Sequence, residues 1–102
     1  MAISDVQLKN GWYQIIDDSG KKVKEMSVSS VGTLCGISSD FAVFLKNGWF
    51  ATYDEQGKKI KESSQSSLGE FKNTAGSSIN FNKNGWIGTY DKNLKKISER
   101  HA

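Results

Sequence analysis

The sequence predicts an all-β protein made of three tandem four-stranded antiparallel meanders of about 37 residues each. A motif, Lys-Asn-Gly-Trp, begins at Lys9, Lys46 and Lys83, so it recurs every 37 residues. A fixed period of this size indicates a repeat architecture. Short β-rich runs alternate with turns rich in Gly, Asn and Asp, as in successive hairpins. No segment shows the 3.6-residue apolar period of a helix, and there is no proline.

The second copy shows all four strands of the unit. They are expected over 31–37, 41–45, 49–53 and 58–64. Asn47-Gly48 suits a type I′ turn, because both central residues of that turn need positive φ. Asp54 opens the next turn, which ends at Gly57. The run from Phe41 to Leu45 is apolar throughout, so both faces of this strand are expected to be covered.

The first copy has three strands, because its first strand would fall before Met1. Strands are expected over 1–8, 12–16 and 21–28 in this copy, and over 68–74, 78–82, 86–90 and 95–100 in the third. Asn80 and Asn82 replace Val43 and Leu45, so one face of that strand should be less buried. In the last turn Asn93-Leu94 replaces the glycine, and asparagine can adopt the left-handed conformation.

Such a unit, apolar on both faces with a polar last strand, is typical of a β-propeller blade. We expect one domain divided into repeats at 1–30, 31–67 and 68–102. Propellers have about four to eight blades, so three repeats predict a ring closed by a homodimer or a higher homo-oligomer. The unpaired edge of the first repeat also favours completion by another chain. A β-trefoil is the main alternative, followed by an open single-layer sheet.

At the level of pattern, the chain resembles small repeat proteins that build propellers by oligomerisation, including some bacterial and fungal lectins. The resemblance covers residues 3–100 and depends on the meander and on the recurring Asn-Gly-Trp, Tyr-Asp and Lys-Lys-Ile segments. It implies a binding or scaffold module, and carbohydrate is one ligand class that it suggests. No specific family is recognised, so no site residues are carried over.

Composition restricts the function classes. Aromatic residues make up 11% of the chain and the net charge is +3, which fits a folded, mildly basic domain. We see no apolar run of membrane-spanning length and no signal-peptide pattern. Cys35 is the one cysteine, which favours a reducing compartment, and the expected location is the cytoplasm.

The chain offers little for catalysis, and we expect neither an enzyme nor a metal or cofactor site. Cys35 and His101 are the only thiol and imidazole; a buried thiol and a frayed terminus are the interpretations we favour. The recurring aspartates are expected to cap their own turns, and the recurring glutamates to pair with lysines, rather than to bind calcium or act as acids and bases. These residues are Asp17, Asp54 and Asp91, with Glu25, Glu62 and Glu99.

Three tryptophans are the best candidates for ligand binding. Trp12, Trp49 and Trp86 follow the Asn-Gly turns directly. They are expected near one rim, together with the amides of Asn10, Asn47 and Asn84 and the serine-rich linkers. Aromatic planes beside polar groups suit a carbohydrate. The competing interpretation, which we favour from the sequence, is that the indole rings pack between blades.

The opposite rim carries a second candidate surface, made of lysines. These are Lys21, Lys22, Lys58, Lys59, Lys92, Lys95 and Lys96. A basic crown could bind nucleic acid or an acidic protein partner. Acidic neighbours and the single arginine argue against nucleic acid, and we favour solvated lysines that discourage sheet aggregation.

Overall fold

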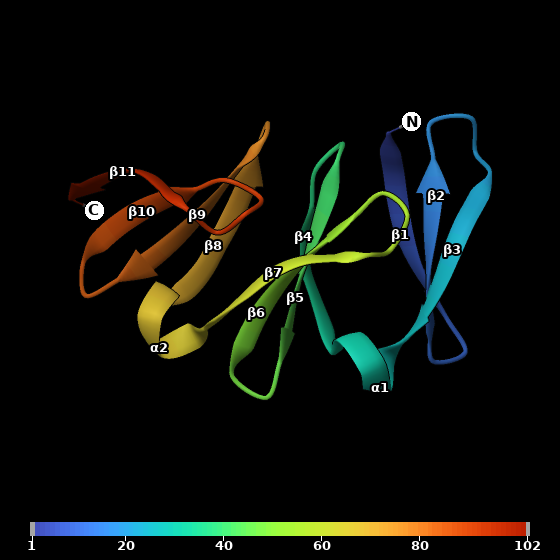
Figure 1. Cartoon of the computed structure of the whole chain (residues 1–102), viewed down its shortest axis with the longest axis horizontal. Helices are drawn as coiled ribbons and strands as arrows, with labels where there is room; N and C mark the ends of the chain where they lie inside the picture. Colours follow the sequence, from blue (N-terminus) through green and yellow to red (C-terminus); the bar gives the residue numbers. More distant parts are fainter. Residues whose placement is uncertain (1, 102) are drawn as a thin grey trace.

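The computed structural model describes residues 2–101. Within this range the chain forms eleven strands and two single-turn helices (Figure 1). The strands are β1 Ile3–Lys9, β2 Trp12–Asp17, β3 Lys22–Ser27, β4 Thr33–Ile37, β5 Phe41–Lys46, β6 Trp49–Asp54, β7 Lys59–Ser64, β8 Glu70–Ala75, β9 Ser78–Lys83, β10 Trp86–Tyr90 and β11 Lys96–His101. The helices are α1 Val28–Val31 and α2 Gln65–Leu68.

The strands make three separate antiparallel sheets, ordered β1-β2-β3, β4-β5-β6-β7 and β8-β9-β10-β11. Each strand pairs with its neighbour in sequence, so each sheet is a meander. The all-β prediction is therefore confirmed, and the sheets begin at β1, β4 and β8. Neither a trefoil barrel nor one continuous sheet forms, because no hydrogen-bonded strand pair joins one sheet to another within residues 2–101. In Figure 1 the sheets fan out side by side without closing into a ring.

The serine-rich linkers form helical turns, which were not predicted from the sequence. The side chains of Ser27 and Ser64 cap α1 and α2 by accepting the backbone N–H of Ser30 and Ser67, at 3.2 Å in each case. One turn is too short to show a 3.6-residue period. As a result, the strands expected to start at residues 31 and 68 start at residues 33 and 70.

Two glycines end these helical turns. Gly32 and Gly69 have φ of 89° and 98°, a region that residues with a side chain rarely adopt. A Cβ atom at either position would also collide with the backbone oxygen of Leu45 or of Asn82. Glycine is therefore required where the linker turns into the first strand of each complete sheet.

The tight turns mostly follow the prediction. Asn47 and Gly48 have φ of 51° and 80°, which fits the predicted type I′ turn. The exception is the last turn, where Leu94 has φ of 58°. The left-handed residue is thus Leu94 and not Asn93. Leu94 occupies the place of Gly57, and its side chain packs against the second core.

Two hydrophobic cores join the three sheets. The first lies between the first and second sheets, where Phe44 is fully buried between the rings of Tyr13 and Tyr53, with centroids at 5.2 and 5.4 Å. The second lies between the second and third sheets, where the rings of Phe50 and Phe81 are 4.9 Å apart. The prediction that β5 is covered on both faces is confirmed, since it contributes to both cores.

The three sheets pack as a stack with the second sheet in the middle. The two outer faces of this stack carry polar residues at positions that are apolar in the second sheet. On the first sheet, Asp5 and Gln7 are exposed where the second sheet buries Ala42 and Phe44. On the third sheet, Asn80 and Asn82 replace Val43 and Leu45, as noted in the sequence. The amide of Asn80 donates to Asn73 at 2.9 Å and accepts from Thr89 at 2.6 Å, so this buried amide finds its partners within its own sheet.

The polar outer faces affect whether sheets of other copies can pack against this chain. A ring closed by two or more chains would require these two outer faces to be covered by other copies. Covering Asp5, Gln7 and Asn82 would remove polar groups from water, which costs free energy unless the other copy supplies hydrogen-bond partners. In repeat proteins such polar outer faces mark the terminal units. The ring stays a prediction, and the composition of these faces argues against it.

Candidate functional site

The three tryptophans open equivalent strands and are half exposed. Trp12, Trp49 and Trp86 are the first residues of β2, β6 and β10, with 47%, 49% and 45% of their surface accessible. The interpretation that these rings pack between blades is therefore wrong for this chain. Phenylalanine and tyrosine fill the cores instead, and the indoles remain available to a ligand.

A pocket of about 230 Å³ lies beside the second tryptophan. Its wall along β6 is formed by Trp49, Ala51 and Tyr53, which alternate onto one face of the strand. Ala51 is small, so it leaves a hollow between the two aromatic side chains. The rest of the lining comes from α1, the β5–β6 turn and β7: Ser30, Val31, Lys46, Asn47, Lys59 and Glu62.

A second pocket, of about 260 Å³, lies at the matching place on the third sheet. Here Gly88 sits between Trp86 and Tyr90 on β10. The remaining lining residues are Ser67, Leu68, Phe81, Lys83, Asn84, Lys96 and Glu99. Apart from Phe81, every one of the lining residues stands 37 positions after a lining residue of the first pocket.

The two pockets keep the same chemistry while the sheets around them diverge. Serine, two lysines, asparagine, tryptophan, tyrosine and glutamate recur at the same positions. The two lining positions that change, Val31 to Leu68 and Ala51 to Gly88, remain small or apolar. Elsewhere, exchanges such as Cys35 to Lys72 alter size and charge.

The first sheet keeps the tryptophan but not its surroundings. At the positions of Ala51 and Tyr53 it carries Gln14 and Ile16. The Gln14 amide donates to the Glu25 carboxylate at 2.9 Å, so a bulky polar side chain lies where the other sheets have alanine or glycine. Trp12 and its turn residue Asn10 are thus exposed without the tyrosine and the small residue that shape the two pockets.

Charges in the pockets are arranged in the same way twice. The Lys59 ammonium pairs with Glu62 at 3.3 Å, and the Lys96 ammonium with Glu99 at 3.4 Å. A second lysine in each pocket donates to a linker carbonyl: Lys46 to Ser30 and Lys83 to Ser67, both at 3.3 Å. The predicted pairing of the strand glutamates with lysines is confirmed, and it includes Lys22 with Glu25 at 3.3 Å.

The recurring turn aspartates are structural, as predicted. Asp54 accepts the backbone N–H of Gln56 and of Lys58, both at 2.9 Å, and Asp17 and Asp91 cap their turns in the same way. The Ser19 hydroxyl, 2.7 Å away, and the N–H of Lys21 lower the pKa of the Asp17 carboxyl. Within residues 2–101, no three potential ligand side chains gather as a metal site.

Cys35 and His101 lie in different surroundings. The Cys35 thiol packs against the second core, and burial raises its pKa, which makes the thiolate scarce. The His101 ring contacts Trp86 edge-on at 4.8 Å. These contacts give no sign of a nucleophile–base pair.

The predicted basic rim is partly neutralised. Lys22, Lys59 and Lys96 pair with the strand glutamates, and Lys92 pairs with Asp40 at 3.2 Å. Membrane insertion through a helix has no support in the described part of the chain, since neither four-residue helix could cross a bilayer.

Comparison with known proteins adds information on the fold. No protein-family model matches the chain, and no curated protein matches it. Among solved structures, it is similar to BamB from Moraxella catarrhalis, a β-propeller, with a TM-score of 0.52 and 12% sequence identity. The match covers 100% of this chain and 37% of that chain. At this identity the similarity concerns the fold alone, and it shows that the three sheets are arranged in a β-propeller-like way.

Proposed function

We propose that this chain is a non-catalytic binding module on a β-propeller-like scaffold, and that the pockets beside Trp49 and Trp86 each hold one ring of a carbohydrate. The observation that carries the proposal is the recurrence of one pocket, with the same polar and aromatic side chains, on two sheets that otherwise differ. The module acts as a single chain, since the outer faces of the stack are polar.

The chemistry of the lining suits a sugar ring. A pyranose presents an apolar face and a rim of hydroxyls. The half-exposed indole of Trp49 offers a plane for that apolar face, and Tyr53 borders the hollow over Ala51. Around them, Ser30, Asn47 and the charged side chains supply donors and acceptors for hydroxyl groups. Small-ligand sites commonly combine aromatic walls with a few polar groups in this way.

The first sheet provides a matched control. Trp12 is as exposed as Trp49 and follows the same kind of turn, but Gln14 takes the place of the small residue. Tryptophan thus recurs at this position even where the neighbouring residues on the strand differ. The proposal therefore requires that the loss of Trp49 weakens ligand binding and that the loss of Trp12 does not. A purely structural role of these tryptophans would not produce such a difference in binding.

The test is glycan-array binding followed by titration with the sugars that bind. Trp49→Ala and Trp86→Ala should each weaken binding by about five- to tenfold, in line with the loss of one aromatic contact, whereas Trp12→Ala should leave it unchanged. Circular dichroism would check that all three variants remain folded. Silence across a broad array, or equal losses for the three variants, would overturn the carbohydrate proposal.

A further inference from the structure

We infer that the two pockets select an acidic carbohydrate, and that one linear chain of acidic sugar units occupies both pockets at once. The inference rests on the carbohydrate-binding function proposed above. It concerns the charge of the ligand and its length, which that proposal leaves open.

The first observation is the charge balance inside each pocket. The lining of the first pocket has two lysines and one glutamate, Lys46, Lys59 and Glu62, and the second pocket has the same set. The glutamate neutralises one lysine in each case, at 3.3 and 3.4 Å. Each pocket therefore retains one positive charge that no acidic side chain of its lining balances.

The second observation concerns where that charge is held. Within residues 2–101, the Lys46 ammonium makes one hydrogen bond, to the Ser30 carbonyl at 3.3 Å. Lys83 repeats this geometry with Ser67. A long hydrogen bond to a neutral carbonyl leaves the other ammonium protons free for a carboxylate or sulfate. Since Lys46 and Trp49 line the same pocket, an acidic group carried by a ring stacked on the indole lies within reach of the ammonium.

The third observation is the placement of the two pockets. Both include the last residues of a linker helix, Ser30 and Val31 from α1 and Ser67 and Leu68 from α2. These two helices lie along the same edge of the molecule, the lower edge in Figure 1. The longest dimension of the chain is 40 Å, so both pockets lie within the span of a single oligosaccharide. Binding at one pocket then raises the local concentration of ligand at the other.

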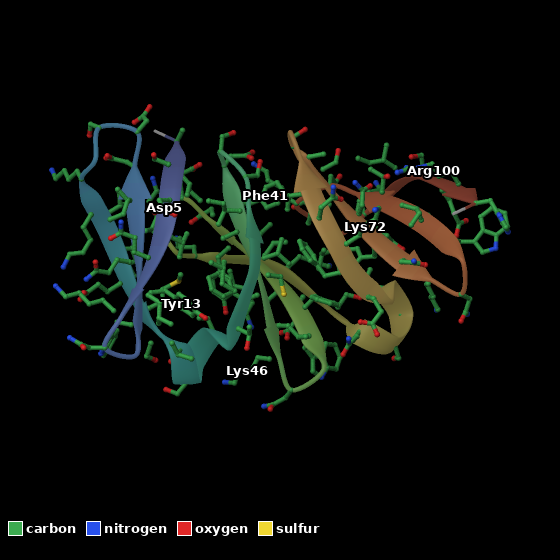
Figure 2. All side chains as sticks on the ribbon, turned by 180° about the vertical axis from the view of Figure 1, so that it is seen from behind. Asp5, Tyr13, Phe41, Lys46, Lys72 and Arg100 are labelled. Atoms are coloured by element: carbon green, nitrogen blue, oxygen red, sulfur yellow. The ribbon has the colours of Figure 1, made fainter. Side chains whose placement is uncertain are left out.

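Figure 2 shows the same molecule from behind, with Lys46 at the lower edge, close to α1, and with Lys72 and Arg100 on the third sheet. Lys46 is therefore separated from the basic residues of that outer face. Its role can be tested without disturbing them. Lys9 precedes Asn-Gly-Trp in the first sheet as Lys46 does in the second, which makes Lys9 the matched control.

The experiment is isothermal titration with four probes: digalacturonate, a long oligogalacturonate, and the neutral pair of cellobiose and a long cello-oligosaccharide. The acidic probes should bind about fivefold more tightly than the neutral probes of equal length, the gain expected for one exposed charge contact. This preference should shrink as salt is added. The long acidic probe should bind up to a hundredfold more tightly than the short one.

Variants then assign the effect to the pockets. Lys46→Gln and Lys83→Gln should each reduce the acidic preference and should each lower the gain from length by about fivefold, while Lys9→Gln should change neither. Equal affinity for acidic and neutral probes would overturn the charge inference and leave the carbohydrate proposal standing. Equal affinity for short and long acidic probes would overturn the single-chain inference. If none of these probes, and no glycan on an array, binds, the inference and the proposed function fail together.

Discussion

The Tyr13 hydroxyl and the backbone N–H of Leu34 form a 3.0 Å hydrogen bond between the first and second sheets. Leu34 lies on β4, the first strand of the second sheet, and Tyr13 lies on β2 and is buried. The phenol oxygen satisfies an N–H at the free edge of β4. The Tyr13 side chain therefore contributes both to the first core and to a hydrogen bond that joins the two sheets.

Removing that hydroxyl should destabilise the chain without changing its fold. Tyr13→Phe keeps the ring beside Phe44 but leaves the Leu34 N–H without its partner, at a cost of about 1–3 kcal/mol. Urea unfolding would measure the change. Tyr90→Phe is the control, because Tyr90 is more exposed than Tyr13. Equal losses in the two variants would contradict the assigned role of Tyr13.

Equivalent positions in different sheets should respond very differently to truncation. Phe44 is fully buried between Tyr13 and Tyr53, so Phe44→Ala should cost about 3–5 kcal/mol. Gln7 stands 37 positions earlier on the exposed outer face, and Gln7→Ala should change stability by less than about 0.5 kcal/mol. If Phe44→Ala does not fold, Phe44→Leu provides a milder test by the same urea titration. Similar losses at the two positions would show that the first sheet is covered in solution.

The pocket on the second sheet should close when Ala51 is replaced by glutamine, the residue at the equivalent position of the first sheet. In Ala51→Gln, the new amide can bond Glu62 as Gln14 bonds Glu25, and it fills the hollow between Trp49 and Tyr53. Because Ala51 is buried in the first core, we expect the larger side chain to cost about 1–3 kcal/mol of stability, and we expect carbohydrate binding to fall to the level of one pocket. The measurement is the stoichiometry from titration with a sugar too short to reach both pockets. Gly88→Gln is the partner variant, in which the new Cβ also displaces the Tyr90 ring. Unchanged stoichiometry would mean that the ligand lies elsewhere.

The pH dependence of stability should reflect Asp17. Hydrogen bonds from Ser19 and Lys21 lower its folded-state pKa below the usual value of 3.8. The ionised form is therefore favoured by folding: its contribution is present above that usual value and is lost as the pH falls through the lowered one. Unfolding of the native chain and of Asp17→Asn, measured at pH 7 and pH 2, should show a difference that shrinks at low pH. A constant difference would contradict this assignment.

Much of the fold follows from local chemistry and was predictable. Asn-Gly turns, aspartate caps and apolar alternation each act within a few residues, so the order of the strands could be inferred from their spacing. The helical turns α1 and α2 could not, because one turn has no periodicity. The signal that could have revealed them is local: Ser27 and Gly32, like Ser64 and Gly69, have the spacing of a helix cap and a helix end.

The candidate site was predicted only in part. The sequence identified the tryptophan-bearing rim, but Trp49 had to be seen beside α1 before a pocket could be recognised. Exposure of the indoles was missed, since a recurring tryptophan fits a packed position equally well. Both pockets have a small residue, Ala51 or Gly88, between Trp and Tyr and take further lining from a linker helix, whereas the first sheet carries Gln14 at that position.

We propose that the three sheets, whose outer faces are polar, stay a single chain in solution and do not form part of a ring with other copies; this is the central claim. A positive control for association is the double variant Asn80→Val/Asn82→Leu, which restores the residues of the second sheet. It breaks the bonds of Asn80 to Asn73 and Thr89, creates an apolar outer face and should self-associate.

Native mass at micromolar concentration tests that claim most directly. The account predicts a single species of 11.3 kDa for the natural sequence, and larger species for the double variant. A stable dimer or trimer of the natural chain, with Asp5, Gln7 and Asn82 protected from hydrogen exchange, would contradict it and support the ring.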